Sequence, residues 1–117
     1  MFGRKPKWTN WSGSVSATPE RVVKPDSIDA LIAAVRETAA RGAKLRVVGS
    51  GHSFSPLVPT DQTMLSLEKL RGLAEVDREG RSATALAGTP INALGDLLAE
   101  HGLALANQGD IDAQAIA

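Results

Sequence analysis

The most informative part of the sequence is Arg46-Val47-Val48-Gly49-Ser50-Gly51-His52-Ser53-Phe54-Ser55. It begins within a short β-branched run, Leu45–Val48, which predicts a buried strand. The two glycines that follow predict a loop whose backbone can approach a ligand closely, because glycine has no Cβ. Amide N–H groups exposed in such a loop, together with the serine hydroxyls, suit the pyrophosphate of a dinucleotide. The stretch therefore predicts a dinucleotide site, with a plain glycine-rich turn as the alternative.

A Rossmann fold would use a similar strand and loop, but it also requires a third glycine that opens a helix. Phe54 occupies the place of that glycine, and Pro56 follows with no helical pattern behind it. For the acidic residue that binds ribose, Asp61 is too close and Glu68 has no supporting pattern. The sequence thus argues against a Rossmann fold. On these residues alone, His52 could equally be a hydrogen-bonded loop histidine.

A strand and a helix precede this loop. Residues 21–24 are the predicted strand. Asp26 or Ser27 then caps a helix that ends near Gly42, where a left-handed C-terminal cap is expected. The helix is predicted to bury one apolar face, made of Ile28, Leu31, Ile32, Val35 and Ala39.

Further strands and a second helix follow the loop. Residues 64–67 are a predicted strand, and 73–77 and 82–87 are predicted to pair as a hairpin. A second helix is expected to start at Thr89-Pro90, with the proline at the first helical position. Its buried stripe would be Ile91, Leu94, Leu97 and Leu98, and residues 103–106 could begin another strand. This mixed order of elements predicts an α+β fold.

The composition is that of a soluble globular protein and excludes several classes. The 117 residues carry 13 basic and 13 acidic side chains, so no net positive charge favours nucleic acid. With no cysteine and two histidines, disulfides are excluded and no metal site is expected. No apolar run is long enough for a transmembrane helix, and none suits a secretory signal. A cytoplasmic location is expected, and membrane association through regions beyond this chain stays open.

Several short motifs, in order along the chain, carry a resemblance to a known family. They are Asn10-Trp11, Pro19, and the segments 22–25, 47–53, 60–61, 87–90, 100–104 and 107–110. From Asn10 onward the sequence resembles the sugar-lactone and alditol oxidase branch of the vanillyl-alcohol-oxidase type flavoproteins. This branch includes L-gulonolactone oxidase and D-arabinonolactone oxidase.

The resemblance implies a PCMH-type FAD-binding domain, with FAD as the cofactor. Residues 21–70 would form the complete first subdomain, and residues 71–117 the start of a truncated second one. The family's substrate domain, and the catalytic residues within it, would be absent. Residues 1–20 are expected to be an irregular lead-in, with Trp11 packing it onto the domain.

The resemblance also assigns two cofactor-binding stretches. The first is Val47, Val48, Gly49, Ser50, Gly51, His52 and Ser53, against the pyrophosphate and the flavin. The second is 109–115, where Gly109, Asp110 and Ala115 would lie near the adenosine diphosphate. Asp110 replaces a serine of some relatives, and its carboxylate would repel pyrophosphate, so contact through its backbone N–H or with a ribose hydroxyl is favoured.

In this family, the histidine at the place of His52 is commonly bonded through a ring nitrogen to the 8α carbon of the isoalloxazine. The resemblance therefore makes His52 the candidate residue for a covalent flavin link. The chemistry is reasonable, because a neutral imidazole is a competent nucleophile near pH 7.

The implied function is the FAD-binding portion of an oxidoreductase that oxidises a hydroxyl group of a sugar lactone or polyol. The cofactor would accept a hydride, and oxygen or another acceptor would reoxidise it. The 117-residue chain alone is not expected to turn over substrate. Two alternatives stay open: a nucleotide- or partner-binding module without redox activity, and a truncated product kept folded by oligomerisation.

Overall fold

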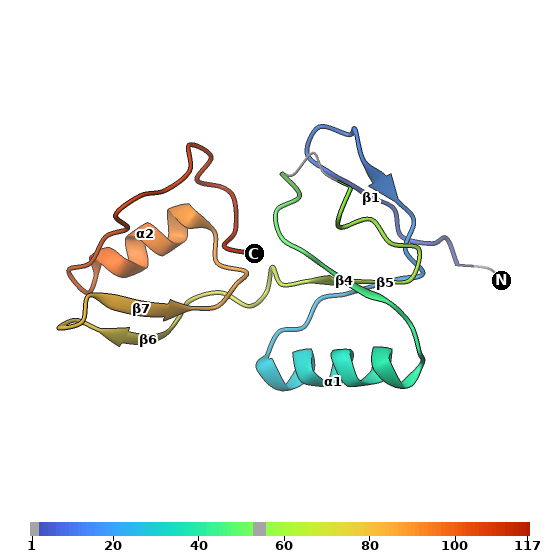
Figure 1. Cartoon of the computed structure of the whole chain (residues 1–117), viewed down its shortest axis with the longest axis horizontal. Helices are drawn as coiled ribbons and strands as arrows, with labels where there is room; N and C mark the ends of the chain where they lie inside the picture. Colours follow the sequence, from blue (N-terminus) through green and yellow to red (C-terminus); the bar gives the residue numbers. More distant parts are fainter. Residues whose placement is uncertain (1–2, 53–55) are drawn as a thin grey trace.

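A computed structural model describes residues 3–52 and 56–117 of the chain. Within these ranges the chain forms three small sheets and two helices (Figure 1). In order, the elements are β1 (Trp8–Thr9), β2 (Ser16–Ala17), β3 (Arg21–Val23), α1 (Ile28–Ala40), β4 (Leu45–Val48), β5 (Thr63–Ser66), β6 (Leu73–Asp77), β7 (Ser82–Ala85) and α2 (Ile91–Ala99). The predicted α+β class is confirmed. Ser53, which was predicted to contact the cofactor, lies outside the described residues.

The chain forms two lobes, and the first contains β3, α1, β4 and β5. It is built on a parallel sheet in the order β3-β5-β4, with α1 along one face (Figure 1). All four residues of the central strand β5 are buried, because it has a neighbour on each side. The core beneath α1 contains Ala34, Leu65, Leu67 and Leu70. β4 is an edge strand, so the prediction of a buried strand holds only for Val48, while Val47 remains 44% exposed.

Helix α1 has the predicted ends but not the predicted buried face. The hydroxyl of Ser27 accepts a hydrogen bond from the N–H of Ala30 at 3.1 Å, and Gly42 adopts φ +64° after the last turn. Ile28 and Ile32, however, are 49% and 42% exposed. Val35 is also largely exposed, whereas Ala34 and Thr38 are the buried residues of the helix.

A hydrogen-bond network explains why α1 turns Thr38 inward. The Thr38 hydroxyl donates to the Ala34 carbonyl at 2.8 Å and accepts from Nη2 of Arg21 at 2.9 Å. Nε of Arg21 also donates to the Thr63 hydroxyl at 3.2 Å, so β3, α1 and β5 meet at this guanidinium. Buried polar groups need such partners, and the small side chains on this face let the helix approach the sheet.

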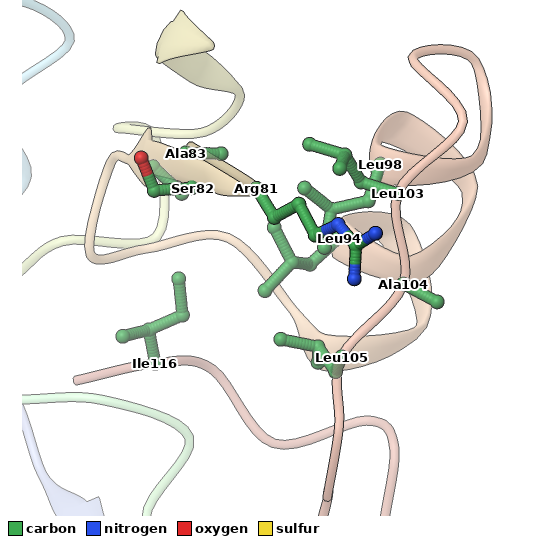
Figure 2. A pocket seen from close by; sticks show the side chains of 10 residues that line it. Arg81, Ser82, Ala83, Leu94, Leu98, Leu103, Ala104, Leu105 and Ile116 are labelled. Atoms are coloured by element: carbon green, nitrogen blue, oxygen red, sulfur yellow. The ribbon is translucent and has the colours of Figure 1, made fainter. Parts of the chain in front are cut away.

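The second lobe holds the β6–β7 hairpin and α2 (Figure 1). Pro90 precedes the helix as its N-cap residue and is not at the first helical position as predicted. Residues 103–106 form no strand. Residues 103–105 instead border an apolar hollow of about 290 Å³ against α2 and β7, whose lining includes Leu94, Leu98, Leu103, Leu105 and the Arg81 side chain (Figure 2).

The two lobes give the chain an elongated shape. Its extents are 55 × 32 × 22 Å and its radius of gyration is 16.2 Å, against about 13 Å for a compact domain of 100 residues. Gly88 lies at the junction, where its N–H donates to the Leu70 carbonyl at 2.9 Å. A Cβ on Gly88 would collide with the backbone carbonyl of Leu67, so this close approach requires glycine.

The N-terminal segment is more ordered than predicted. β1 and β2 pair as antiparallel strands, Trp8 with Ala17 and Thr9 with Ser16. Asn10 is 3% exposed, and its Oδ1 accepts a hydrogen bond from the N–H of Val15 at 3.1 Å. This hydrogen bond spans five positions and closes the connection between the two strands.

Candidate functional site

The loop after β4 offers unpaired backbone donors. Among the described residues, the N–H groups of Ser50, Gly51 and His52 donate to no protein acceptor. Gly51 has φ +71°, a conformation that favours glycine. A Cβ on Gly49 would collide with the carbonyl of Ala117, the last residue of the chain. Such a run of free amides suits an anion or a polar cofactor.

Ser50 links this loop to the C-terminal segment. Its Oγ accepts a hydrogen bond from the N–H of Ala115 at 2.7 Å and donates to the carbonyl of Ala113 at 3.4 Å. The C-terminal segment is itself held against the second lobe, since the N–H of Ile91 donates to the Gln114 carbonyl at 2.8 Å. One side chain therefore joins the two stretches that the sequence predicted to share a cofactor.

A cavity of about 330 Å³ opens where the two stretches meet. It is lined by Val47, Val48, Gly49, Ser50, Gly51, His52, Val58, Gln114, Ala115 and Ala117. A second cavity of about 160 Å³ shares Gly49, Ser50 and Ala115 with the first and continues toward Gly88 and Arg71. Together they form a hollow along the line where the two lobes adjoin, which is concave enough for a small-molecule ligand.

His52 lies in the first cavity with an unusual ring environment. Its Nδ1 is buried and has no hydrogen-bond partner among the described residues. The ring stacks on the indole of Trp11, with centroids 6.1 Å apart and an interplanar angle of 28°. A buried polar atom without a partner is costly, so its presence points to a function.

Charged groups near the smaller cavity balance one another. Glu68 and Arg71 both line it, and Nζ of Lys24 lies 2.9 Å from Oε1 of Glu68. The hydrogen bond from Lys24 is the main cause that lowers the pKa of Glu68 below its usual value. The carboxylate is thereby partly neutralised at the edge of the hollow.

The predicted second stretch is only partly at the hollow. Ala115 lines both cavities, whereas Gly109 and Asp110 are exposed and line neither. Their contact with a cofactor stays a prediction. Gln114 lies within the predicted stretch and lines the larger cavity. Val58 and Ala117 also line it and were not predicted, because no local motif marks them.

The prediction that Trp11 packs onto the domain is half right. Trp11 remains 56% exposed, yet one face of its indole contacts His52. This stack joins residues from two different segments, so sequence spacing gives no signal for it.

Residues 3–52 and 56–117 contain no group of three or more His, Cys, Asp or Glu side chains placed to hold a metal ion. In the same ranges, neither helix has the length and apolar character to cross a membrane.

Comparison with known proteins agrees with this geometry. L-gulono-1,4-lactone dehydrogenase of Mycobacterium tuberculosis is 39% identical over 111 residues, which cover 95% of this chain and 26% of that protein. D-arabinono-1,4-lactone oxidase of Eremothecium gossypii is also 39% identical over 111 residues, covering 92% and 21%. The chain thus spans about a quarter of the length of these curated relatives.

The fold has a close counterpart among solved structures. The crystal structure of cholesterol oxidase from B. sterolicum superposes with a TM-score of 0.80 at 24% identity, covering 96% of this chain and 22% of that one. The family described as "FAD binding domain" matches residues 19–117, which include both lobes and the whole candidate site. The chain therefore belongs to the FAD binding domain family, and FAD is its cofactor.

Proposed function

We propose that this chain supplies the FAD-binding surface of an oxidoreductase and holds the cofactor in the hollow beside Ser50. The observation that carries the proposal is the pair of hydrogen bonds of the Ser50 hydroxyl, which donates to the Ala113 carbonyl and accepts from the Ala115 N–H. They bring the glycine loop and the C-terminal segment to one cavity. A dinucleotide is long enough to contact both segments, and the free N–H groups of the loop match the oxygens of its pyrophosphate.

The residues of the glycine loop have distinct roles in this proposal. Ser50, Gly51 and His52 present their N–H groups, and Gly49 lets the C-terminal segment approach the loop, because a Cβ there would overlap the carbonyl of Ala117. When bound, FAD supplies a two-electron acceptor for a carbon that carries a hydroxyl group. The described part of the chain contributes binding, orientation and exclusion of water around that cofactor.

We also propose that His52 carries a covalent link to the flavin. The position of His52 supports this assignment, because the residue lines the cavity and its Nδ1 has no hydrogen-bond partner among the described residues. The bond would form through the lone pair of an unprotonated ring nitrogen. The cavity gives that ring direct access to a ligand.

The proposed substrate class is a sugar lactone or polyol, oxidised at a hydroxyl group. It rests on the names of the relatives, which are a lactone dehydrogenase and a lactone oxidase. Since the matched region is about a quarter of those proteins, we propose that the 117 residues bind FAD without turning over substrate alone. The cytoplasmic location and the oligomeric state stay predictions from the sequence.

A titration of the purified chain tests the proposal. FAD is expected to bind saturably and with higher affinity than ADP, because the flavin adds contacts around His52. Equal affinity for FAD and ADP would favour the nucleotide-binding alternative, and absence of FAD binding would contradict the proposal. Flavin absorbance that stays with acid-precipitated protein, together with an increased intact mass, would identify the covalent link. Loss of both in His52→Ala would locate that link at His52.

A further inference from the structure

We infer that Trp11 is the positioning residue of His52: its indole holds the imidazole ring in the orientation that faces the cofactor cavity. The inference rests on the proposed function, in which His52 is the side chain that meets the flavin. It starts from the stacked rings, whose centroids are 6.1 Å apart at an interplanar angle of 28°. This separation lies within the range in which aromatic rings attract each other.

The backbone of Trp11 is tied directly to the His52 loop. Its N–H donates to the carbonyl of Gly51 at 2.9 Å, which fixes the peptide plane that leads into His52. Trp8 lies beside the same loop, since its Cζ2 is 3.5 Å from the position that a Cβ on Gly51 would occupy. Trp11 therefore contacts the loop through both a backbone hydrogen bond and its ring.

The turn that carries Trp11 is itself closed by hydrogen bonds. The N–H of Asn10 donates to the Val15 carbonyl at 2.9 Å, and the N–H of Gly13 donates to the Asn10 carbonyl at 3.1 Å. Nδ2 of Asn10 donates to the Ser14 hydroxyl at 3.0 Å. A turn held at these points presents the indole from a fixed position, as a residue that orients another side chain must do.

The exposure of Trp11 favours a role of this kind over simple core packing. An indole that served only to bury apolar area would be covered, but Trp11 is 56% exposed. The buried Nδ1 of His52 has no hydrogen bond within the described residues to set the ring plane. Among the described residues, the stacked indole of Trp11 is an aromatic contact that restrains that plane.

NMR on the flavin-free 117-residue chain tests the positioning role directly. We expect nuclear Overhauser contacts between the Trp11 indole and the His52 ring, and a ring-current shift of the His52 carbon-bound protons that Trp11→Ala abolishes. Trp11→Phe should restore part of the shift. Ile28→Ala removes another exposed apolar side chain, on α1, and should leave the His52 signals unchanged. A well-dispersed amide spectrum shows that each variant is folded.

FAD titration then measures the consequence for binding. Loss of one aromatic contact should weaken FAD binding about threefold to tenfold in Trp11→Ala, with partial rescue by Trp11→Phe. Absence of indole–imidazole contacts in the wild-type chain would overturn the inference, as would unchanged FAD affinity in folded Trp11→Ala. If the wild-type chain bound no FAD, the proposed function would fail, while the ring contacts and shifts would still decide whether Trp11 orients His52.

Discussion

The backbone N–H of Ala115 donates a hydrogen bond to Oγ of Ser50, with 2.7 Å between the nitrogen and the oxygen, and the two residues are 65 positions apart in the sequence. The bond connects a loop of the first lobe with a segment held against the second. Because this bond ties the two stretches together beside the cavity, Ser50 is expected to set the width of the cofactor hollow.

Ser50→Ala should therefore weaken FAD binding about tenfold, since the N–H of Ala115 would lose its partner and the two segments would separate more easily. Fluorescence titration with FAD measures the change. Ser82→Ala, on the exposed strand β7, is the matched control and should bind FAD like the wild type. Equal affinity in the Ser50 and Ser82 variants would argue against a bridging role for Ser50.

Gly88→Ala should destabilise the chain by about 1–3 kcal/mol, because the new Cβ would overlap the carbonyls of Leu67 and Leu70. Gly95→Ala is the control: nothing lies within 4 Å of its Cβ position in α2, and loss of glycine flexibility should stabilise that helix by about 0.5–1 kcal/mol. Urea unfolding gives both free energies. Effects of the same sign at the two glycines would contradict the close approach at Gly88.

Thr38→Val should cost about 1–3 kcal/mol of unfolding free energy, because Nη2 of Arg21 would lose its buried acceptor. Thr84→Val places the same change on exposed strand β7 and should have little effect. Thermal unfolding followed by circular dichroism compares the two. A Thr38 variant as stable as the wild type would mean that the helix face is fixed by something other than this network.

The Lys24–Glu68 ion pair should make a small, pH-dependent contribution. Folding lowers the pKa of Glu68, so the stabilisation is present above the ordinary value of 4.5 and is lost as pH falls through the lowered pKa. Lys24→Met should cost at most about 1 kcal/mol at neutral pH, because both side chains are about half exposed. Well below pH 4.5 the cost should vanish.

Urea unfolding at the two pH values measures this difference, with Lys44→Met as the control for loss of a surface lysine. The Lys44 variant should show the smaller change between neutral and acidic pH. A Lys24 effect that grew on acidification would contradict the predicted sign.

The sequence predicted local structure better than packing. The strand at 73–77 was predicted with its observed bounds, and β4 likewise, since short β-branched runs between turn residues are local signals. The buried face of α1 was predicted wrongly except at Leu31, which packs against the core. The face that turns inward carries Thr38, which accepts a hydrogen bond from Arg21. That bond joins residues of separate elements, so the spacing of apolar residues along α1 gives no sign of it.

The candidate site shows the same division. The motif predicted the glycine loop as a dinucleotide site, and the family resemblance assigned His52 and the C-terminal segment with Ala115. These residues line one cavity, and their contact with FAD stays a prediction. The stack of Trp11 on His52 and the hydrogen bond from Ala115 to Ser50 were not predicted. Both depend on how distant segments meet, which spacing along one chain cannot specify.

Amide chemical-shift mapping with FAD tests the central claim most directly. When FAD is added to the nitrogen-15-labelled chain, the largest shifts should fall on the N–H groups of Ser50, Gly51, His52 and Ala115, with little change around Leu98 and Leu103. Largest shifts around the apolar hollow of the second lobe, or an unchanged spectrum at saturating FAD, would contradict the account.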